Sequence, residues 1–203
     1  MGLSTIDSFK TAVSADFARS NLFKVSLDFP TEAATIGGKK TEAGDANKTA
    51  KFFCRAAQMP ASTIGVIEVP VQGRTYKIPG DRTFEPWTIT VMNDRNQKLR
   101  RSFERWINLM NNAKKNRSNY KGLTYFSNPT VDLLSKYAKG EEGDDGYTIK
   151  KYKFHHCYPS NISSMDLDAN ANDQIMEFTV EWQYAYWTVT EGDSVDGVTL
   201  PGA

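Results

Sequence analysis

The sequence lacks an excess of charge of either sign. Its 203 residues include 25 Lys and Arg and 24 Asp and Glu, so the formal net charge is +1. A general nucleic-acid binder usually carries a basic excess, and that class of protein is therefore disfavoured. A net charge this small puts little electrostatic repulsion between copies of the chain, so self-association is not opposed.

Long apolar runs and cysteines are also scarce. The N-terminal segment MGLSTIDSFKTAV has no apolar signal core, and no run in the chain is long enough to span a bilayer. The two cysteines are Cys54 and Cys157. Without a secretory signal we expect both thiols to be reduced, and we expect no membrane association.

No motif of a catalytic or phosphate-binding site is present. The pair Gly38-Lys39 lacks the earlier glycine of a phosphate loop, because Ala33 stands at that position. A nucleophile elbow and zinc-type motifs are missing as well. The acidic pairs between residues 141 and 145 lie in a glycine-rich turn, where a solvated loop is the simpler interpretation. We therefore predict no enzyme activity and no cofactor.

Two segments partly match the sequence patterns of metal sites. Residues 166–177, DLDANANDQIME, nearly match a calcium loop, but Ala171 replaces its glycine and the flanking segments resemble strands. We expect a polar loop with Asx turns there instead. His155 and Cys157 share one face of a strand, yet two ligands do not make a site. We predict no metal, and we place His156 in the core or an interface.

The residues that are present favour strands. Hydrophobic residues make up 39% and aromatic residues 12% of the chain, enough for a globular core. Residues 22–29 and 87–91 alternate apolar and polar side chains, which is the pattern of half-buried strands. Residues 66–78 predict a hairpin with its turn at Gln72-Gly73, and Pro79-Gly80-Asp81 predicts a second turn. Residues 130–137 and 147–158 predict a further hairpin.

The strongest patterns are one strand and one helix. Residues 176–186, MEFTVEWQYAY, alternate throughout, which predicts one dry and one wet face. Residues 96–112 predict a helix with a single apolar stripe. We expect the helix to pack on the apolar face of the strand. The predicted core residues are Phe103, Trp106, Ile107 and Met110 of the helix and Phe178, Val180, Trp182 and Tyr184 of the strand.

These elements predict a mainly β (α+β) fold, an antiparallel sheet or β-barrel-like sandwich with one flanking amphipathic helix. We expect a single domain over residues 1–189, with loops at 31–50 and 113–128 and a tail at 190–203. One helix cannot cover both faces of an extended sheet, and open sheet edges invite pairing with another chain. A closed ring of copies, whose strands build a shared barrel, would remove those edges.

Several motifs resemble one known family, the tail tube proteins of contractile-tailed bacteriophages. DFARSNLFKV (16–25) is similar to its N-terminal signature, and GDRTFEPWTITVMND (80–94) is the most specific match. AAQMP (56–60), YPSN (158–161) and the aromatic strand that closes at Trp187 follow in the family's order. The resemblance covers about residues 5–30 and 50–189 and departs from the family in both loops and in the tail.

This resemblance implies a structural virion protein that forms homohexameric rings stacked into a hollow tube within a contractile sheath. The implied partners are other copies, the sheath, baseplate, tape-measure and terminator proteins, and DNA that passes without specific binding. The implied location is the phage tail, after assembly in the host cytoplasm. The alternatives are a type VI secretion-like or phage-derived injection tube subunit, a baseplate paralogue that starts the tube, or a small ligand-binding β-barrel.

Roles for individual residues follow as hypotheses. The candidate lumen face is the wet face with Glu177, Thr179, Glu181 and Gln183, together with Lys151 and Lys153. Cross-strand pairs with the glutamates would keep these lysines from holding DNA phosphates. The candidate ring-to-ring contacts are Gly37, Gly38, Lys39 and Lys40, because a loop at the end of a sheet would lie between rings.

Overall fold

The computed structural model describes residues 6, 17–30, 33, 50–118, 124–135, 148–170, 172 and 174–191, and all structural statements concern these residues. They form ten strands and the helix α3, and residues 50–53 are helical as well. The elements are β1 (Phe23–Ser26), β2 (Cys54–Ala57), β3 (Ser62–Val71), β4 (Arg74–Phe84), β5 (Trp87–Met92), α3 (Lys98–Met110), β6 (Thr130–Leu134), β7 (Thr148–His155), β8 (Tyr158–Ile162), β9 (Glu177–Gln183) and β10 (Tyr186–Glu191).

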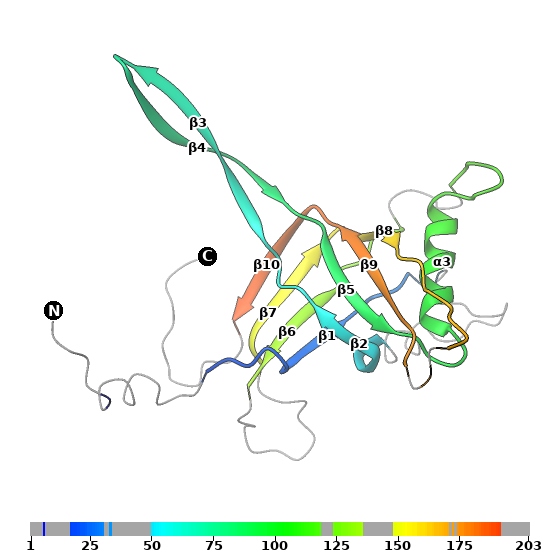
Figure 1. Cartoon of the computed structure of the whole chain (residues 1–203). Helices are drawn as coiled ribbons and strands as arrows, with labels where there is room; N and C mark the ends of the chain where they lie inside the picture. The colour runs from blue at the N-terminus through cyan, green and yellow to red at the C-terminus, as the bar shows by residue number, and fades with distance from the viewer. Residues whose placement is uncertain are drawn as a thin grey trace.

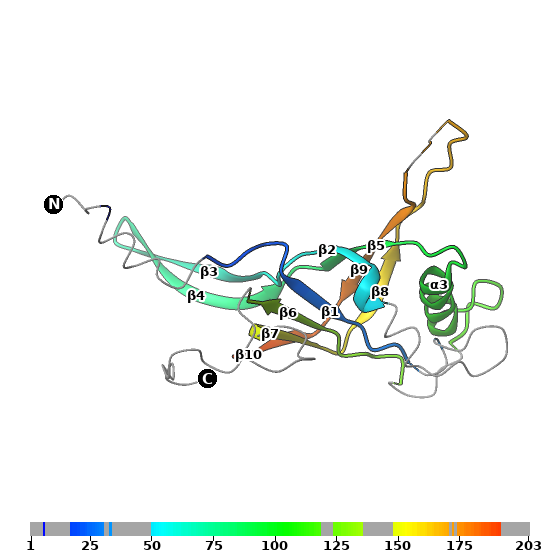
Figure 2. The same cartoon turned by 90° about the horizontal axis from the view of Figure 1, so that it is seen from below.

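The strands build two antiparallel four-stranded sheets and a separate hairpin. One sheet has the order β1-β6-β7-β10 and the other the order β2-β5-β9-β8. The two sheets face each other, and the β3–β4 hairpin projects far from them as an arm (Figures 1 and 2). The mainly β, antiparallel fold with one amphipathic helix is therefore confirmed.

The core lies between the sheets because the strands are apolar on one side only. In β5 and β9 every second residue is buried, and Trp87 stands opposite Trp182 in the strand register. Trp87 also stacks on Phe154 of β7 at a ring-centroid distance of 4.4 Å, which joins the two sheets. The buried residues of this pair of strands are Trp87, Ile89, Val91, Phe178, Val180 and Trp182.

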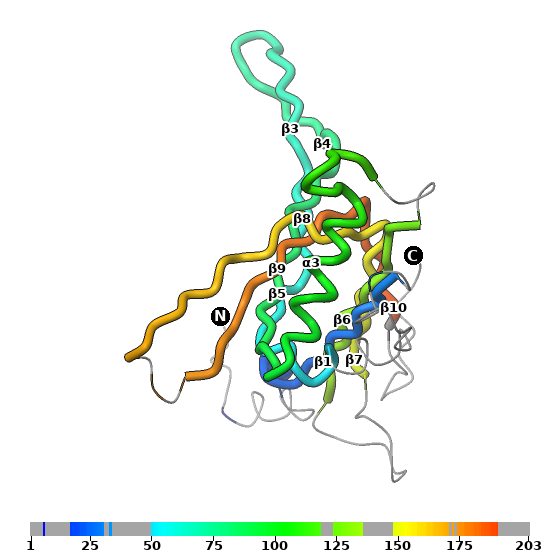
Figure 3. Tube along the Cα trace, turned by 90° about the vertical axis from the view of Figure 1, so that its right-hand side faces the viewer, coloured from blue at the N-terminus to red at the C-terminus, as the bar shows by residue number. Residues whose placement is uncertain are grey.

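Helix α3 covers the rest of the same face of β9. Its apolar stripe follows the helical repeat, so Phe103 and Trp106 are fully buried. Trp106 meets Trp182 edge-on at 5.4 Å, and α3 runs alongside β8 and β9 (Figure 3). The Lys98 N–H at its start donates to Asp94 Oδ1 at 2.7 Å. Of the other predicted core residues of this helix, Ile107 and Met110 are half-buried.

Residues 176–186 are not one strand, contrary to our prediction. The chain leaves one sheet after Gln183 and enters the other at Tyr186, where β10 begins. Tyr184 lies at this bend, half-buried, with its ring edge-on to Phe154 at 5.0 Å. Tyr186 is 43% exposed. The apolar–polar alternation of the sequence continues to Tyr186, but the buried side changes at the bend: β9 buries Phe178, Val180 and Trp182, whereas β10 has Trp187 and Val189 half-buried. β10 also extends to Glu191, past the predicted start of the tail.

The predicted turn at Pro79-Gly80-Asp81 was wrong, and so was the placement of His156 in the core, while its alternative placement in an interface stays a prediction. Pro79-Gly80-Asp81 lies inside β4 instead of forming a turn, and the register shifts opposite it between Ile64 and Val66. A Cβ on Gly80 would come within 3.2 Å of the Gly65 backbone, so the strands approach closely at this bulge. His156 is exposed and outside the core; it has a φ of 55°, and β7 ends just before it.

We predict that Trp182→Ala lowers the free energy of unfolding by about 3–5 kcal/mol, because it leaves a cavity between Trp87, Phe103 and Trp106. Urea unfolding of the unassembled chain measures this change. The matched control is Thr179→Ala on the opposite face of β9, which should stay within about 0.5 kcal/mol of the native chain. Equal stability of Trp182→Ala and the native chain would contradict the packing.

Candidate assembly surface

The arm is a long hairpin closed by a tight turn. Gln72 and Gly73 have φ angles of 45° and 81°, as a two-residue type I′ turn requires. This is the turn predicted from the sequence. The paired strands run from Val71 and Arg74 at the tip to Ser62 and Phe84 at the base. The arm continues the neighbouring pair β2 and β5, because β2 leads into β3 and β4 into β5 (Figure 1).

One face of the arm is apolar and exposed. The register places Ile67 opposite Ile78 and Val69 opposite Tyr76, and alternation puts both pairs on one side together with Val71 and Arg74 at the tip. We call this set of residues (Ile67, Val69, Val71, Arg74, Tyr76 and Ile78) the arm face. The opposite side is mixed, because it carries Val66 and Pro70 as well as the ion pair of Lys77 with Glu68 at 3.6 Å.

Such an arm is not stable by virtue of its own packing. Tyr76 is 67% exposed and Ile67 54% exposed. An isolated two-stranded hairpin is marginal in water, and a contiguous exposed apolar surface marks an interaction site. The arm face is therefore the strongest candidate for a contact surface in the described chain. Sequence reasoning found the hairpin but missed its role. The predicted contact residues Gly37, Gly38, Lys39 and Lys40 lie outside the described residues.

Each four-stranded sheet also ends on both sides in a strand whose outer edge is unpaired. β2 and β8 are the edges of one sheet, and β1 and β10 are the edges of the other. All neighbours within each sheet are antiparallel, so the two edge strands of a sheet run in opposite directions. Copies related by a rotation could therefore join edge to edge, and all neighbouring strands of the joined sheets would still be antiparallel. Sheet edges of this kind are templates for pairing with another chain.

The predicted lumen residues of β9 do share one polar face. Glu177, Thr179, Glu181 and Gln183 are all half-buried, and they point away from the core. The Arg55 guanidinium of β2 donates hydrogen bonds to both carboxylate oxygens of Glu177. Glu181 accepts one from the Asn161 amide at 3.4 Å. Together with Thr88 and Thr90 of β5, these side chains form a surface of hydroxyl, amide and carboxylate groups, which we call the hydroxyl–carboxylate face.

Lys151 and Lys153 do not pair with the glutamates of β9, contrary to our prediction. They belong to β7, which lies in the other sheet between β6 and β10. Lys151 Nζ is 3.7 Å from Asp132 Oδ2, and burial raises the pKa of Asp132 despite this lysine. In the strand register, Lys153 stands opposite Thr130 of β6 and Thr188 of β10. The outward face of one sheet thus carries Lys151 and Lys153 beside Asp132, and that of the other carries Glu177 and Glu181 beside Arg55.

Metal-ligating side chains do not gather in the described part of the chain. The described residues contain no group of three or more His, Cys, Asp or Glu side chains that could hold a metal ion. The predicted Asx turn is confirmed, since Asp168 Oδ1 accepts the Asn170 N–H at 2.9 Å. Ala171, which argued against calcium, lies outside the described residues. In this part of the chain no helix is long and apolar enough to cross a membrane.

The sequence of the chain matches one family of proteins over most of its length. Residues 18–190 match the family model of the phage tail tube protein. The chain belongs to the phage tail tube family. It is a structural tube subunit. The tail tube protein gp19 of Enterobacteria phage T4 is 29% identical over 174 residues, 86% of this chain and 93% of that protein. The tail tube protein of Serratia phage KSP90 is 27% identical over 184 residues, 90% and 95% of the two chains.

Solved structures share the tail tube fold. A chain from the anti-feeding prophage baseplate has a TM-score of 0.57 and 17% identity, and the match covers 86% of this chain and 96% of that one. A chain from the sheath–tube complex of an extracellular contractile injection system, PVC, has a TM-score of 0.50 and 15% identity, with 89% and 97% covered. These likenesses show a common fold.

The two thiols of the tail tube subunit give a prediction about reactivity. Burial raises the pKa of Cys54 and of Cys157 to about 12. Because only the thiolate is nucleophilic, the folded chain should react very slowly with iodoacetamide at about pH 8, whereas the denatured chain, with thiol pKa values near 8.5, should be alkylated at both positions. Mass spectrometry counts the labels. Rapid labelling of the folded chain would contradict this picture.

Proposed function

We propose that copies of this chain form homohexameric rings that stack into the inner tube of a contractile phage tail, the conduit for the genome. In this role the chain catalyses no reaction. The observation that carries the proposal is the exposed arm face on a member of the tail tube family, because a lone subunit leaves this apolar surface in water. We place the ring-to-ring contact on the arm.

Ring closure is supported by the edges of the β2-β5-β9-β8 sheet. Its edge strands β2 and β8 run in opposite directions, so β8 of one copy can pair antiparallel with β2 of the next copy. Repeated around a ring, this pairing leaves no open edge in that sheet. A barrel built from the strands of several copies is wide enough to hold water.

The charge of the two outward faces favours one of them as the lumen. The hydroxyl–carboxylate face carries Glu177 and Glu181, whereas the outward face of the other sheet carries Lys151 and Lys153. Each lysine on a phosphate adds affinity for DNA, so a conduit should present the acidic face to it. Helix α3 packs on the opposite side of the same sheet and would then face outward, toward a sheath.

A second candidate is a tube subunit of an injection system, favoured by the fold shared with the PVC chain. The matched family model and the phage relatives favour the phage tail. A single-chain barrel for an apolar ligand has no comparable support. The space between its sheets is filled by aromatic side chains, among them Trp87, Phe154 and Trp182.

The arm is tested by Tyr76→Asp, which places a charge in the arm face. We expect native thermal stability, because Tyr76 is exposed and outside the core, and we expect the loss of tubes in negative-stain electron microscopy. The matched control is Thr75→Asp, which puts the same charge on the other side of the arm and should leave tubes intact. Normal tubes from Tyr76→Asp would refute a role of the arm in stacking.

The position of the lumen is tested by two cysteine variants of assembled tubes. Thr179→Cys lies on the hydroxyl–carboxylate face, and Arg101→Cys lies on the exposed side of α3. A large maleimide polymer cannot diffuse far into a narrow tube, so it should label Arg101→Cys and spare Thr179→Cys. Dissociated subunits should be labelled at both positions. Equal labelling of the two variants in intact tubes would place the hydroxyl–carboxylate face elsewhere.

A further inference from the structure

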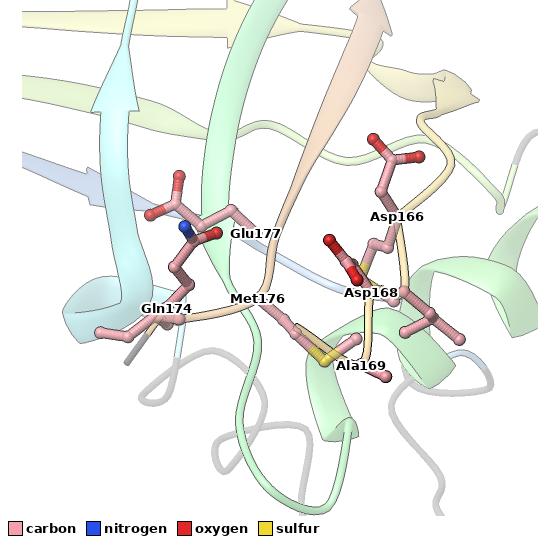
Figure 4. A pocket seen from close by; sticks show the side chains of 9 residues that line it. Asp166, Asp168, Ala169, Gln174, Met176 and Glu177 are labelled. Atoms are coloured by element: carbon pink, nitrogen blue, oxygen red, sulfur yellow. The ribbon is translucent and has the colours of Figure 1, made fainter. Parts of the chain in front are cut away.

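A second protrusion of the chain lines a cavity that is open to solvent. The connection between β8 and β9 leaves the body as two limbs, in a direction different from that of the arm (Figures 2 and 3). A cavity of about 520 Å³ is lined by residues 165–169 and 174–177. Asp166 and Asp168 belong to the limb that leaves β8, while Gln174, Met176 and Glu177 belong to the limb that enters β9 (Figure 4). We call it the β8–β9 cavity.

The β8–β9 cavity combines apolar and acidic side chains. Leu167 is 84% exposed and Ile175 68% exposed, so two large apolar side chains lie in water at its lining. Of its three carboxylates, that of Glu177 is held by Arg55. Within the described part of the chain, the carboxylates of Asp166 and Asp168 have no cationic partner. An occupant that suits this cavity is apolar and carries a positive charge.

The arm face has this chemistry. Tyr76, Val69 and Ile67 supply apolar side chains, and Arg74 supplies a guanidinium at the tip. Arg74 is exposed, and the described residues offer it no ion pair. Arg74 and Tyr76 are two residues apart on one strand, so both side chains point to the same side of the arm. The two protrusions of one chain are therefore complementary in polarity and in charge.

We propose that the arm face of one copy binds in the β8–β9 cavity of a copy in the neighbouring ring. Tyr76 enters between the two limbs, and Arg74 faces Asp166 and Asp168. This inference rests on the proposed function, since it names the partner surface of the arm. The two protrusions of one chain point in different directions, so the contact is formed between copies (Figure 3). A contact between two unlike surfaces can repeat without closing when the rotation between copies does not close a ring, as a stack of rings requires.

Disulfide cross-linking tests which surfaces meet. The double variant Tyr76→Cys, Leu167→Cys is assembled into tubes, oxidised and separated on a non-reducing denaturing gel. We expect a ladder that extends beyond six subunits, because each chain is then linked to the rings on both sides. The control pair Thr75→Cys, Leu167→Cys uses the other side of the arm and should give no ladder. The native thiols, half-buried Cys54 and buried Cys157, have pKa values raised to about 12 and contribute little background.

Other outcomes of this experiment overturn the inference. Tubes that are visible by electron microscopy but give no ladder would show that the arm face lies elsewhere. A covalent species that stops at six subunits would show that the contact joins neighbours within one ring. An equal ladder from the control pair would show that the cross-link does not report the arm face.

Charge reversal separates this inference from the proposed function. Asp168→Arg should abolish sedimentable tubes while rings persist on a sizing column, and Arg74→Asp should do the same. Combining the two changes should restore tubes, because the pair is rebuilt with opposite polarity. Tubes lost with Tyr76→Asp but retained with Asp168→Arg would leave the stacking role of the arm standing and refute its binding in the cavity. Failure of the combined variant to regain tubes would also count against the contact.

Discussion

The packing of Trp182 against α3 decides which surfaces of the tail tube subunit remain available to other copies. This one side chain contacts Trp87 on the neighbouring strand and Phe103 and Trp106 on the helix, with ring centroids 5.4 to 5.9 Å apart. The contact seals one face of the β2-β5-β9-β8 sheet within the chain. The opposite face, the two edge strands and the arm are left unsealed, and these are the surfaces on which assembly depends in the proposed tube.

The sequence predicted those features of the fold whose pattern lies within a single strand or helix. The alternation in β5 and β9 and the stripe of α3 predicted the buried aromatic residues, because period and burial are coupled within each element. The bend at Tyr184 was not predicted, because the apolar–polar alternation of the sequence continues to Tyr186 although the buried side of the chain changes at the bend. Lys151 and Lys153 were assigned to the wrong sheet because strand order depends on distant contacts. The arm face was overlooked as an interface, because an exposed apolar alternation is identical in sequence to a buried one.

The chain divides its assembly contacts between two kinds of interaction. Edge pairing of β2 with β8 would use backbone hydrogen bonds, which depend little on side chains. Stacking through the arm would use apolar burial and an ion pair, which depend strongly on them. A near-zero net charge adds little repulsion to either contact. Substitutions on the arm face can therefore change stacking while the ring and the folded core remain intact.

A contact between unlike surfaces also gives a stack of rings a direction. If every arm enters a β8–β9 cavity of the next ring, one end of the tube presents free arm faces and the other presents unfilled cavities. The two ends then differ in chemistry: one is apolar with Arg74, and the other is apolar with Asp166 and Asp168. A protein that starts the tube and a protein that terminates it would accordingly need different surfaces, each matching one half of the same contact.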